Sequence, residues 1–199
     1  MWTDNLLCAI RFPDWDTALF IAINGFHFDR LDPVMEAFSS IRLWIPLYLI
    51  VMIAIIRKKR IWSIATLAAL GLSFALADQL SVHLFKNVFE RLRPCHVEEL
   101  QTVIHSLEAC GGKYGFISNH AANSFCFAMF TSLFFKNKYY TLMIFFWAVC
   151  VSYSRIYVGK HFPLDVICGA AFGIVCQQTV WLLCRFTFHR FLPQRSLGA

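Results

Sequence analysis

Long apolar stretches separated by short polar segments dominate the sequence. Four stretches come close to or exceed the roughly 20 residues that a helix needs to cross a bilayer, and a fifth is shorter but carries no charge. They occupy residues 34–56, 61–85, 115–135 and 163–188, with the shorter one at 139–153. Because the connecting segments are brief, we expect an all-α fold in which about five transmembrane helices form a tight antiparallel bundle.

Residues 1–33 differ from the rest of the chain. Their apolar stretch, residues 15–28, is too short to span a bilayer, so we expect an amphipathic helix that lies in the membrane interface. If it crosses the membrane instead, the bundle has six spans. The first residues lack the basic side chains that open a secretory signal peptide, so no cleaved signal is expected.

Composition supports a membrane protein. Hydrophobic residues make up 58% of the 199 residues and aromatic residues 17%, whereas only 15% are charged. Such a chain is too apolar for an ordinary soluble domain, and its length favours a single domain, residues 1–199. The net charge of +6 does not indicate a nucleic-acid partner, because the cations cluster between apolar stretches. The expected partner at this point is the bilayer, and the oligomeric state stays open.

The distribution of cations predicts the topology. With five spans, the basic clusters fall at alternate loop ends on one side, which the positive-inside rule makes cytoplasmic. These cations are Arg57, Lys58, Lys59, Arg60, Lys136, Lys138, Arg185, Arg190 and Arg195. Residues 1–33, the loop 86–114 and the loop 155–162 then lie outside. We therefore expect a multi-pass protein of the inner, cytoplasmic membrane whose site faces the periplasm or the cell exterior.

Three short polar strings lie where apolar stretches meet polar loops. They are Lys86-x6-Arg93-Pro94, Ser118-Asn119-His120 and Ser154-Arg155-x5-His161-x3-Asp165. Together they supply three fixed cations, two histidines and a carboxylate. Arginine binds phosphate through a bidentate fork and lysine acts as a point charge. A helix that begins near Ser118 would add its free N–H groups. The set is suited to binding a phosphate and cleaving its ester.

These strings resemble the type 2 phosphatidic acid phosphatase family, whose pattern is K-x6-R-P, P-S-G-H and S-R-x5-H-x3-D. The first and third parts match fully. The second part keeps Ser118 and His120 but has Ile117 and Asn119 where the family has proline and glycine. Asparagine tolerates the left-handed backbone better than most residues, so the turn is expected to survive.

The resemblance implies a role for each residue. His161 is the nucleophile that forms a phosphohistidine, and Asp165 accepts a hydrogen bond from one of its ring nitrogens. His120 protonates the leaving oxygen and later activates water. The phosphate is held by Lys86, Arg93, Ser118, Asn119 and Arg155. No metal or other cofactor is required, because the fixed cations neutralise the phosphoryl charge.

Other polar residues support alternative interpretations. Asp78 lies inside an expected span, where an ionisable residue is costly and often functional. Either it orients or neutralises an active-site cation, or it has no part in the site. Asn123 and Ser154 could support the site from behind, although a plain interhelical hydrogen bond is the simpler role for Asn123. Arg91 lies outside the pattern and is interpreted as solvated or in contact with lipid phosphate. A structural role is favoured for His83, His96 and His105.

Two of the eight cysteines lie in the outer loop. Cys95 and Cys110 are 15 residues apart, and in an oxidising compartment they could form a disulfide worth about 3 kcal/mol. That bond would restrain the loop that carries Arg93. Zinc binding by Cys95, His96, His105 and Cys110 is conceivable, but the spacing matches no common zinc motif.

The pattern thus favours an integral membrane phosphatase that hydrolyses a lipid phosphate or diphosphate monoester at the outer face. The expected substrate is a phospholipid or polyprenyl phosphate, with undecaprenyl diphosphate favoured and lipid A or phosphatidylglycerophosphate as the alternative. A non-catalytic lipid-phosphate binder is a second hypothesis, supported by the altered Ser118-Asn119-His120 string. A transporter or channel would have polar residues throughout the bundle, whereas here they concentrate at one end.

Overall fold

The computed structural model describes residues 12–191, with side chains described as far as residue 186. The start of the chain, including Cys8, and Arg195 lie outside this part. The described chain is helical, and Leu92 and Tyr114 form an isolated bridge instead of part of a strand. The expected all-α fold is therefore confirmed for the described residues. The longer helices are α1 (Asp14–Gly25), α2 (Asp32–Ser39), α3 (Ile41–Lys59), α4 (Ser63–Ser81), α6 (Asn119–Phe135), α7 (Lys138–Tyr157) and α8 (Pro163–Phe191).

Short helical turns connect these elements. The turn η2 (Arg60–Trp62) joins α3 to α4, and the π-turn η3 (Val82–Lys86) leads into α5 (Asn87–Phe89). The loop that follows contains the turns η4 (Pro94–His96) and η5 (Glu98–Leu100). A π-turn is a local widening that is often found at functional sites, and here it ends at Lys86.

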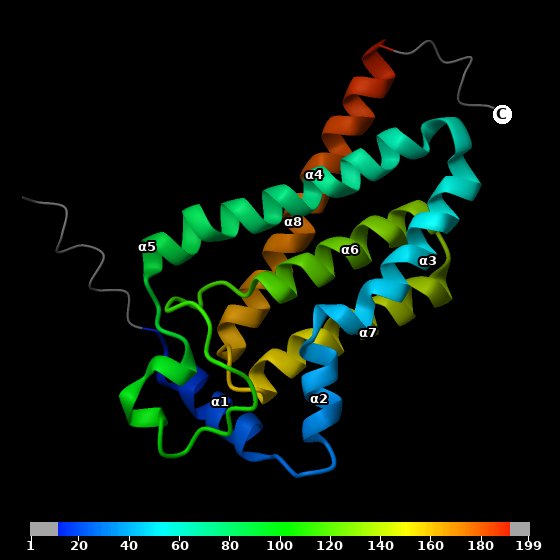
Figure 1. The fold of residues 1–199 in the computed structure, drawn as a ribbon. Helices are drawn as coiled ribbons and strands as arrows, with labels where there is room; N and C mark the ends of the chain where they lie inside the picture. The colour runs from blue at the N-terminus through cyan, green and yellow to red at the C-terminus, as the bar shows by residue number, and fades with distance from the viewer. Residues whose placement is uncertain (1–11, 192–199) are drawn as a thin grey trace, which may run out of the picture.

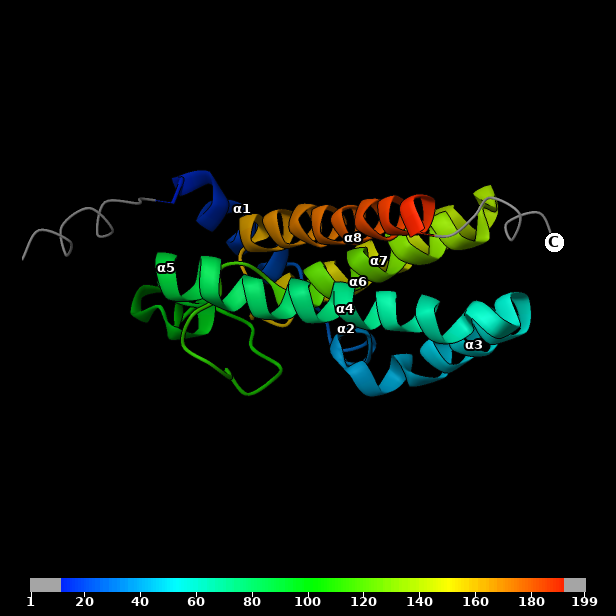
Figure 2. The same ribbon diagram turned by 90° about the horizontal axis from the view of Figure 1, so that it is seen from above.

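The helix α6 forms the interior of the bundle and packs against α4, α7 and α8. Figure 1 shows that the start of α6, the end of α7, the start of α8 and the loop after α5 gather at the end of the bundle near α1. The turn between α3 and α4 lies at the other end. Seen from above in Figure 2, the long helices run side by side. All three polar strings are therefore brought to one end of the bundle.

The five expected spans correspond to the long helices α3, α4, α6, α7 and α8, with two corrections. The stretch 34–56 is not one helix, because the helix is interrupted at Ser40. There α2 meets the helical stretch Ile41–Phe89 at a bend of 53°. The stretch 139–153 belongs to a longer helix, α7. By length and composition, one described helix is apolar enough to cross a membrane (Pro163–Phe186), or two if the bent pair counts as one span. The number of spans stays a prediction.

Large apolar side chains cover the outside of the long helices. Ile50, Ile64, Leu142, Phe146 and Leu182 are each more than 60% exposed. Aromatic side chains from several helices fill the interior, where Tyr48, Phe127 and Trp147 meet edge to face. An exposed apolar surface of this extent indicates contact with lipid.

Glycines allow α8 to approach α6 closely. A Cβ atom on Gly173 would overlap the carbonyl of Ala122, and one on Gly169 would crowd the backbone of Ser118. Small residues four apart on a helix are a common means of close packing between membrane helices. The start of α8 is thereby held against the start of α6.

The helix expected within residues 15–28 is present as α1. Its buried face carries Asp16, Phe20 and Asn24, whereas Leu19 and Ile21 are exposed. This face packs against α7 and α8. Its placement in the membrane interface stays a prediction.

Candidate active site

Backbone hydrogen bonds join the three polar strings. The Ser118 N–H donates to the carbonyl of Asp165 at 2.9 Å, which ties the start of α6 to the start of α8. After α7 the chain turns back at Gly159 (φ +79°), and the His161 N–H donates to the carbonyl of Arg155 at 3.2 Å. Glycine suits this left-handed position because it has no Cβ. The turn places His161 beside Arg155.

His161 lies in a buried, strongly cationic environment. Its side chain is 2% exposed, and its Nδ1 atom lies 3.5 Å from Oδ2 of Asp165. Burial holds the pKa of His161 well below its usual value, and the charges of Arg93, Arg155 and Lys86 add to this effect. The ring is therefore neutral, which leaves a nitrogen lone pair available for attack.

Within the part of the chain that the structure describes, three buried polar atoms of the strings have no hydrogen-bond partner: Ser118 Oγ, Arg155 Nε and His161 Nδ1. Ser118 is the residue before the first turn of α6, and its hydroxyl does not cap that turn. The first N–H groups of a helix lack partners within the helix and favour anions. Buried groups of this kind are rarely left unpaired, so Ser118 Oγ and Arg155 Nε fit a site that binds an anion. Nδ1 of His161 instead faces Asp165 at 3.5 Å, and the hydrogen bond expected between them is not formed.

His120 stands in the first turn of α6, on the same side of the protein. It interacts electrostatically with Arg155, His161 and Glu108. The two histidines of the polar strings are therefore brought together with the cations. Burial lowers the pKa of Arg93, whereas Asp165 acts in the opposite direction.

Arg91 is not solvated, and the interpretation of it as a lipid contact is wrong. Its side chain is 7% exposed and pairs with Asp165 through Nη1 at 2.6 Å and with Asp16 through Nη2 at 2.5 Å. The second oxygen of Asp165 accepts from the Phe162 N–H at 3.0 Å. Asp165 is thus held by two groups besides its approach to His161.

Asn119 begins α6 and does not adopt the left-handed conformation expected for it. The described residues other than glycine with positive φ are Arg60, Glu90 and Lys136. Its side chain turns toward α4, where Nδ2 donates to Asp78 at 2.6 Å and Oδ1 accepts from Ser81 at 2.9 Å. Asp78 therefore contacts Asn119 directly and acts on Lys86 electrostatically.

A cavity of about 430 Å³ lies between α3, α4 and α6, next to these residues. Its lining includes Tyr48 and Phe74 together with Asp78 and Asn123. Asn123 Oδ1 has no hydrogen-bond partner among the described residues. Ser154 turns away from the site, because its hydroxyl donates to the carbonyl of Val151 in its own helix at 2.7 Å.

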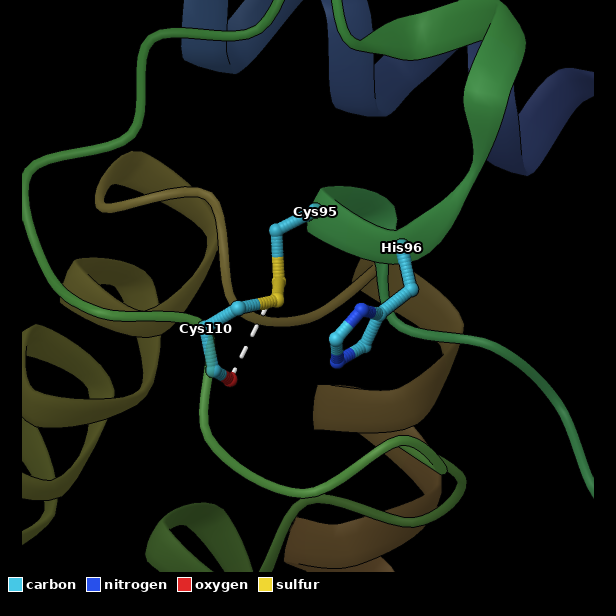
Figure 3. Close-up of side chains that lie close together, drawn as sticks. All are labelled: Cys95, His96 and Cys110. Atoms are coloured by element: carbon cyan, nitrogen blue, oxygen red, sulfur yellow. Dashed lines mark hydrogen bonds between the residues drawn. A yellow bond between two sulfur atoms is a disulfide. The ribbon is translucent and has the colours of Figure 1, made fainter.

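A disulfide joins Cys95 and Cys110, whose Cα atoms lie 5.9 Å apart (Figure 3). The ring of His96 lies beside the bond in the same view. His105 points elsewhere, since its Nε2 lies 3.0 Å from Asp32 and its ring stacks on His27. Of the four residues considered for zinc, Cys95 and Cys110 are therefore joined in a disulfide, and His105 belongs to a separate cluster.

Known proteins resemble this chain in sequence and in fold. The family model described as "PAP2 superfamily" matches residues 66–189, which is more than half of the chain. The chain belongs to the PAP2 superfamily. It is a membrane protein, because it belongs to the PAP2 superfamily and because large apolar side chains are exposed along its long helices.

The relatives of this chain in the PAP2 superfamily are named after different lipid substrates. The chain is 35% identical over 176 residues to a lipid A 4'-phosphatase from Porphyromonas gingivalis, covering 87% of this chain and 75% of that protein. It is 34% identical over 162 residues to an undecaprenyl-diphosphatase from Sulfolobus acidocaldarius, covering 80% and 73%. The crystal structure of a transmembrane PAP2-type phosphatidylglycerolphosphate phosphatase from Bacillus subtilis has the same fold, with a TM-score of 0.68 at 21% identity over 94% of this chain and 92% of that one.

The PAP2 pattern did not reveal every residue at the site. Arg155 Nη1 approaches Ser39 of α2 and, at 3.6 Å, Glu108 of the outer loop. Lys160 also approaches Glu108, at 3.3 Å. Glu108 stands two residues before Cys110, so the expected disulfide already indicated that its loop is held near the site. Nothing in the sequence indicated Ser39.

Proposed function

We propose that this protein is an integral membrane lipid phosphatase that works through a phosphohistidine on His161 without a metal ion. The observation that carries the proposal is the buried, neutral His161, which backbone hydrogen bonds hold near Ser118 and Arg155. The Oγ atom of Ser118 and the Nε atom of Arg155 are buried without a hydrogen-bond partner among the described residues. A phosphoryl group in transfer spreads negative charge over its oxygens and needs fixed donors around it. Lys86, Arg93 and the start of α6 supply further positive potential.

In the proposed reaction, the nitrogen Nε2 of His161 attacks phosphorus, and the bond between phosphorus and the lipid oxygen breaks. His120 gives its proton to that oxygen as the lipid leaves. His120 then takes a proton from water, which attacks the phosphohistidine and releases phosphate. Asp165 lies beside Nδ1 of His161, and it steadies the ring as positive charge develops there.

For the substrate, we infer a lipid A phosphate monoester first and undecaprenyl diphosphate second. The sequence pattern favoured undecaprenyl diphosphate, but the similarity to a lipid A 4'-phosphatase supports the alternative at least as well. The cavity between α3, α4 and α6 suits an apolar chain, because Ile41, Phe74 and Ala75 line it next to Asp78. Asp78 in turn contacts Asn119 at the start of α6.

We also propose that the site faces the periplasm or the cell exterior from the inner membrane. The basic residues Arg57, Lys58 and Lys59 close α3 at the end of the bundle opposite to the site (Figure 1), and such clusters favour the cytoplasm. The disulfide supports an oxidising compartment for the other end. A membrane-impermeant amine reagent applied to intact spheroplasts should label Lys113 of the outer loop and spare Lys58.

The function is tested by phosphate release in detergent from lipid A, undecaprenyl diphosphate and phosphatidylglycerophosphate, with EDTA present. We expect release that resists EDTA, is fastest for lipid A and is lost in His161→Ala. His27→Ala, which removes a histidine stacked on His105 outside the site, should keep wild-type rates. Binding of all three lipids without release from any would support the non-catalytic binder instead.

A further inference from the structure

A buried chain of charges leads from α1 to the nucleophile. Asp16 of α1 and Asp165 of α8 are both fully buried, and the guanidinium of Arg91 bridges them. The other oxygen of Asp16 accepts from the Leu164 N–H at 2.8 Å, so it also holds the first turn of α8. The ring centroids of Phe12 and Phe162 each lie 4.0 Å from the guanidinium carbon of Arg91.

Neither Asp16 nor Asp165 could be buried in its ionised form without the positive charge of Arg91. Removing a buried charge from water is expensive unless the charge is paired and hydrogen-bonded. Asp165 has Arg91 on one oxygen, and the other oxygen faces both the Phe162 N–H and His161. The contact with Arg91 therefore determines which oxygen points toward His161.

We propose that Arg91, held in place by Asp16, is a positioning residue that keeps Asp165 charged and directed at Nδ1 of His161. It does not touch the substrate, because Asp165 and the two phenyl rings surround it. The inference rests on the proposed function, in which His161 is the nucleophile. It adds two residues that the family pattern does not specify, Asp16 in α1 and Arg91 at an unspecified position between Lys86 and Arg93.

The geometry requires arginine. One planar guanidinium presents separate N–H groups to Asp16 and Asp165 at the same time, while its faces stack on Phe12 and Phe162. A lysine ammonium is a compact point charge without such a fork. Arg91→Lys should therefore preserve part of the effect, and Arg91→Gln should lose more.

The test compares kcat, KM and inhibition by inorganic phosphate in Arg91→Lys, Arg91→Gln and wild type. We expect Arg91→Gln to lower kcat about 100-fold, as small displacements of catalytic groups do, with a smaller loss in Arg91→Lys. KM and the inhibition constant of phosphate should stay within about 2-fold, because Arg93 and Arg155 are unchanged. Asp16→Asn should lower kcat less than Arg91→Gln, since it leaves the contact between Arg91 and Asp165.

The matched control is Asp32→Asn, which removes a carboxylate that pairs with His105 and Tyr157 at the same end of the protein. It should lower the unfolding temperature but leave kcat unchanged. If phosphate inhibition weakens in Arg91→Gln as much as kcat falls, or if kcat is unchanged, the positioning role is wrong. An inactive wild type, or a His161→Ala variant with wild-type rates, would instead refute the proposed function.

Discussion

Glu108, in the loop between α5 and α6, lies against Arg155 at the end of α7, with Oε2 of Glu108 3.6 Å from Nη1 of Arg155. Its other oxygen accepts a hydrogen bond from Ser39, which also contacts Arg155. Lys160 approaches the same carboxylate at 3.3 Å. The outer loop and Ser39 thus hold Nη1 of Arg155, whereas its Nε atom has no hydrogen-bond partner among the described residues.

Substituting Glu108→Gln should lower kcat/KM for lipid phosphate by about 10-fold, because Arg155 loses the charge that orients it. Steady-state phosphate release measures this effect. Glu99→Gln, an exposed change of the same kind in the same loop, should have no effect. Equal activity of the two variants would show that Ser39 alone is enough to orient Arg155.

The same carboxylate predicts a pH dependence of stability. Burial alone would raise the pKa of Glu108, but the Ser39 hydroxyl and the charges of Arg155 and Lys160 outweigh it and lower the pKa below its usual 4.5. A carboxyl group whose pKa is lowered in the folded state stabilises the fold at pH values above its unfolded-state pKa. This contribution is lost as the pH falls through the folded-state pKa. The unfolding temperature of wild type should therefore exceed that of Glu108→Gln at neutral pH, and the difference should shrink as the pH falls below 4.5. A difference that does not change with pH would contradict this assignment.

The disulfide should link the redox state to activity. Replacing both Cys95 and Cys110 by serine opens a closed loop of 15 residues and should cost about 3 kcal/mol of stability. Glu108 lies within that loop, so kcat/KM should fall as well. Wild type treated with dithiothreitol should reproduce both effects, measured by thermal unfolding and phosphate release.

The serine variant provides the control for that experiment. It should not respond to dithiothreitol, because the other described cysteines, Cys126, Cys150, Cys168, Cys176 and Cys184, are free. Wild type whose disulfide is shown to be reduced, but whose unfolding temperature and activity do not change, would exclude a restraining role.

The sequence predicted well what depends on local pattern. Apolar runs identified the long helices, and the spacing between His161 and Asp165 placed Asp165 in the first turn of α8 and His161 just before it, since α8 begins at Pro163 as expected. Local pattern also suggested the start of α6 next to Ser118. Helix boundaries and neighbours along the chain follow from short-range rules.

What the sequence missed depends on contacts between distant segments. The partners of Arg91 are 75 and 74 residues away along the chain, so an unmatched arginine in a loop looked solvated. The break at Ser40 lies within an apolar run, and periodicity gives no sign of it. The sequence predicts a turn role for Asn119, whereas its side chain donates to Asp78, 41 residues earlier. Tertiary pairing decided each of these cases.

The close approach of α8 to α6 gives the last prediction. Gly173→Ala should destabilise the protein by about 1–3 kcal/mol, because the added methyl group overlaps the backbone of Ala122 and a packed interface relaxes only partly. The separation of the helices should also weaken the hydrogen bond between the Ser118 N–H and the Asp165 carbonyl and lower kcat. Gly71→Ala in α4 is the matched control, since its Cβ meets nothing within 4 Å, and it should be neutral or stabilising by up to about 1 kcal/mol. If thermal unfolding shows the two variants to be alike, the glycines of α8 do not set the distance between the two halves of the site.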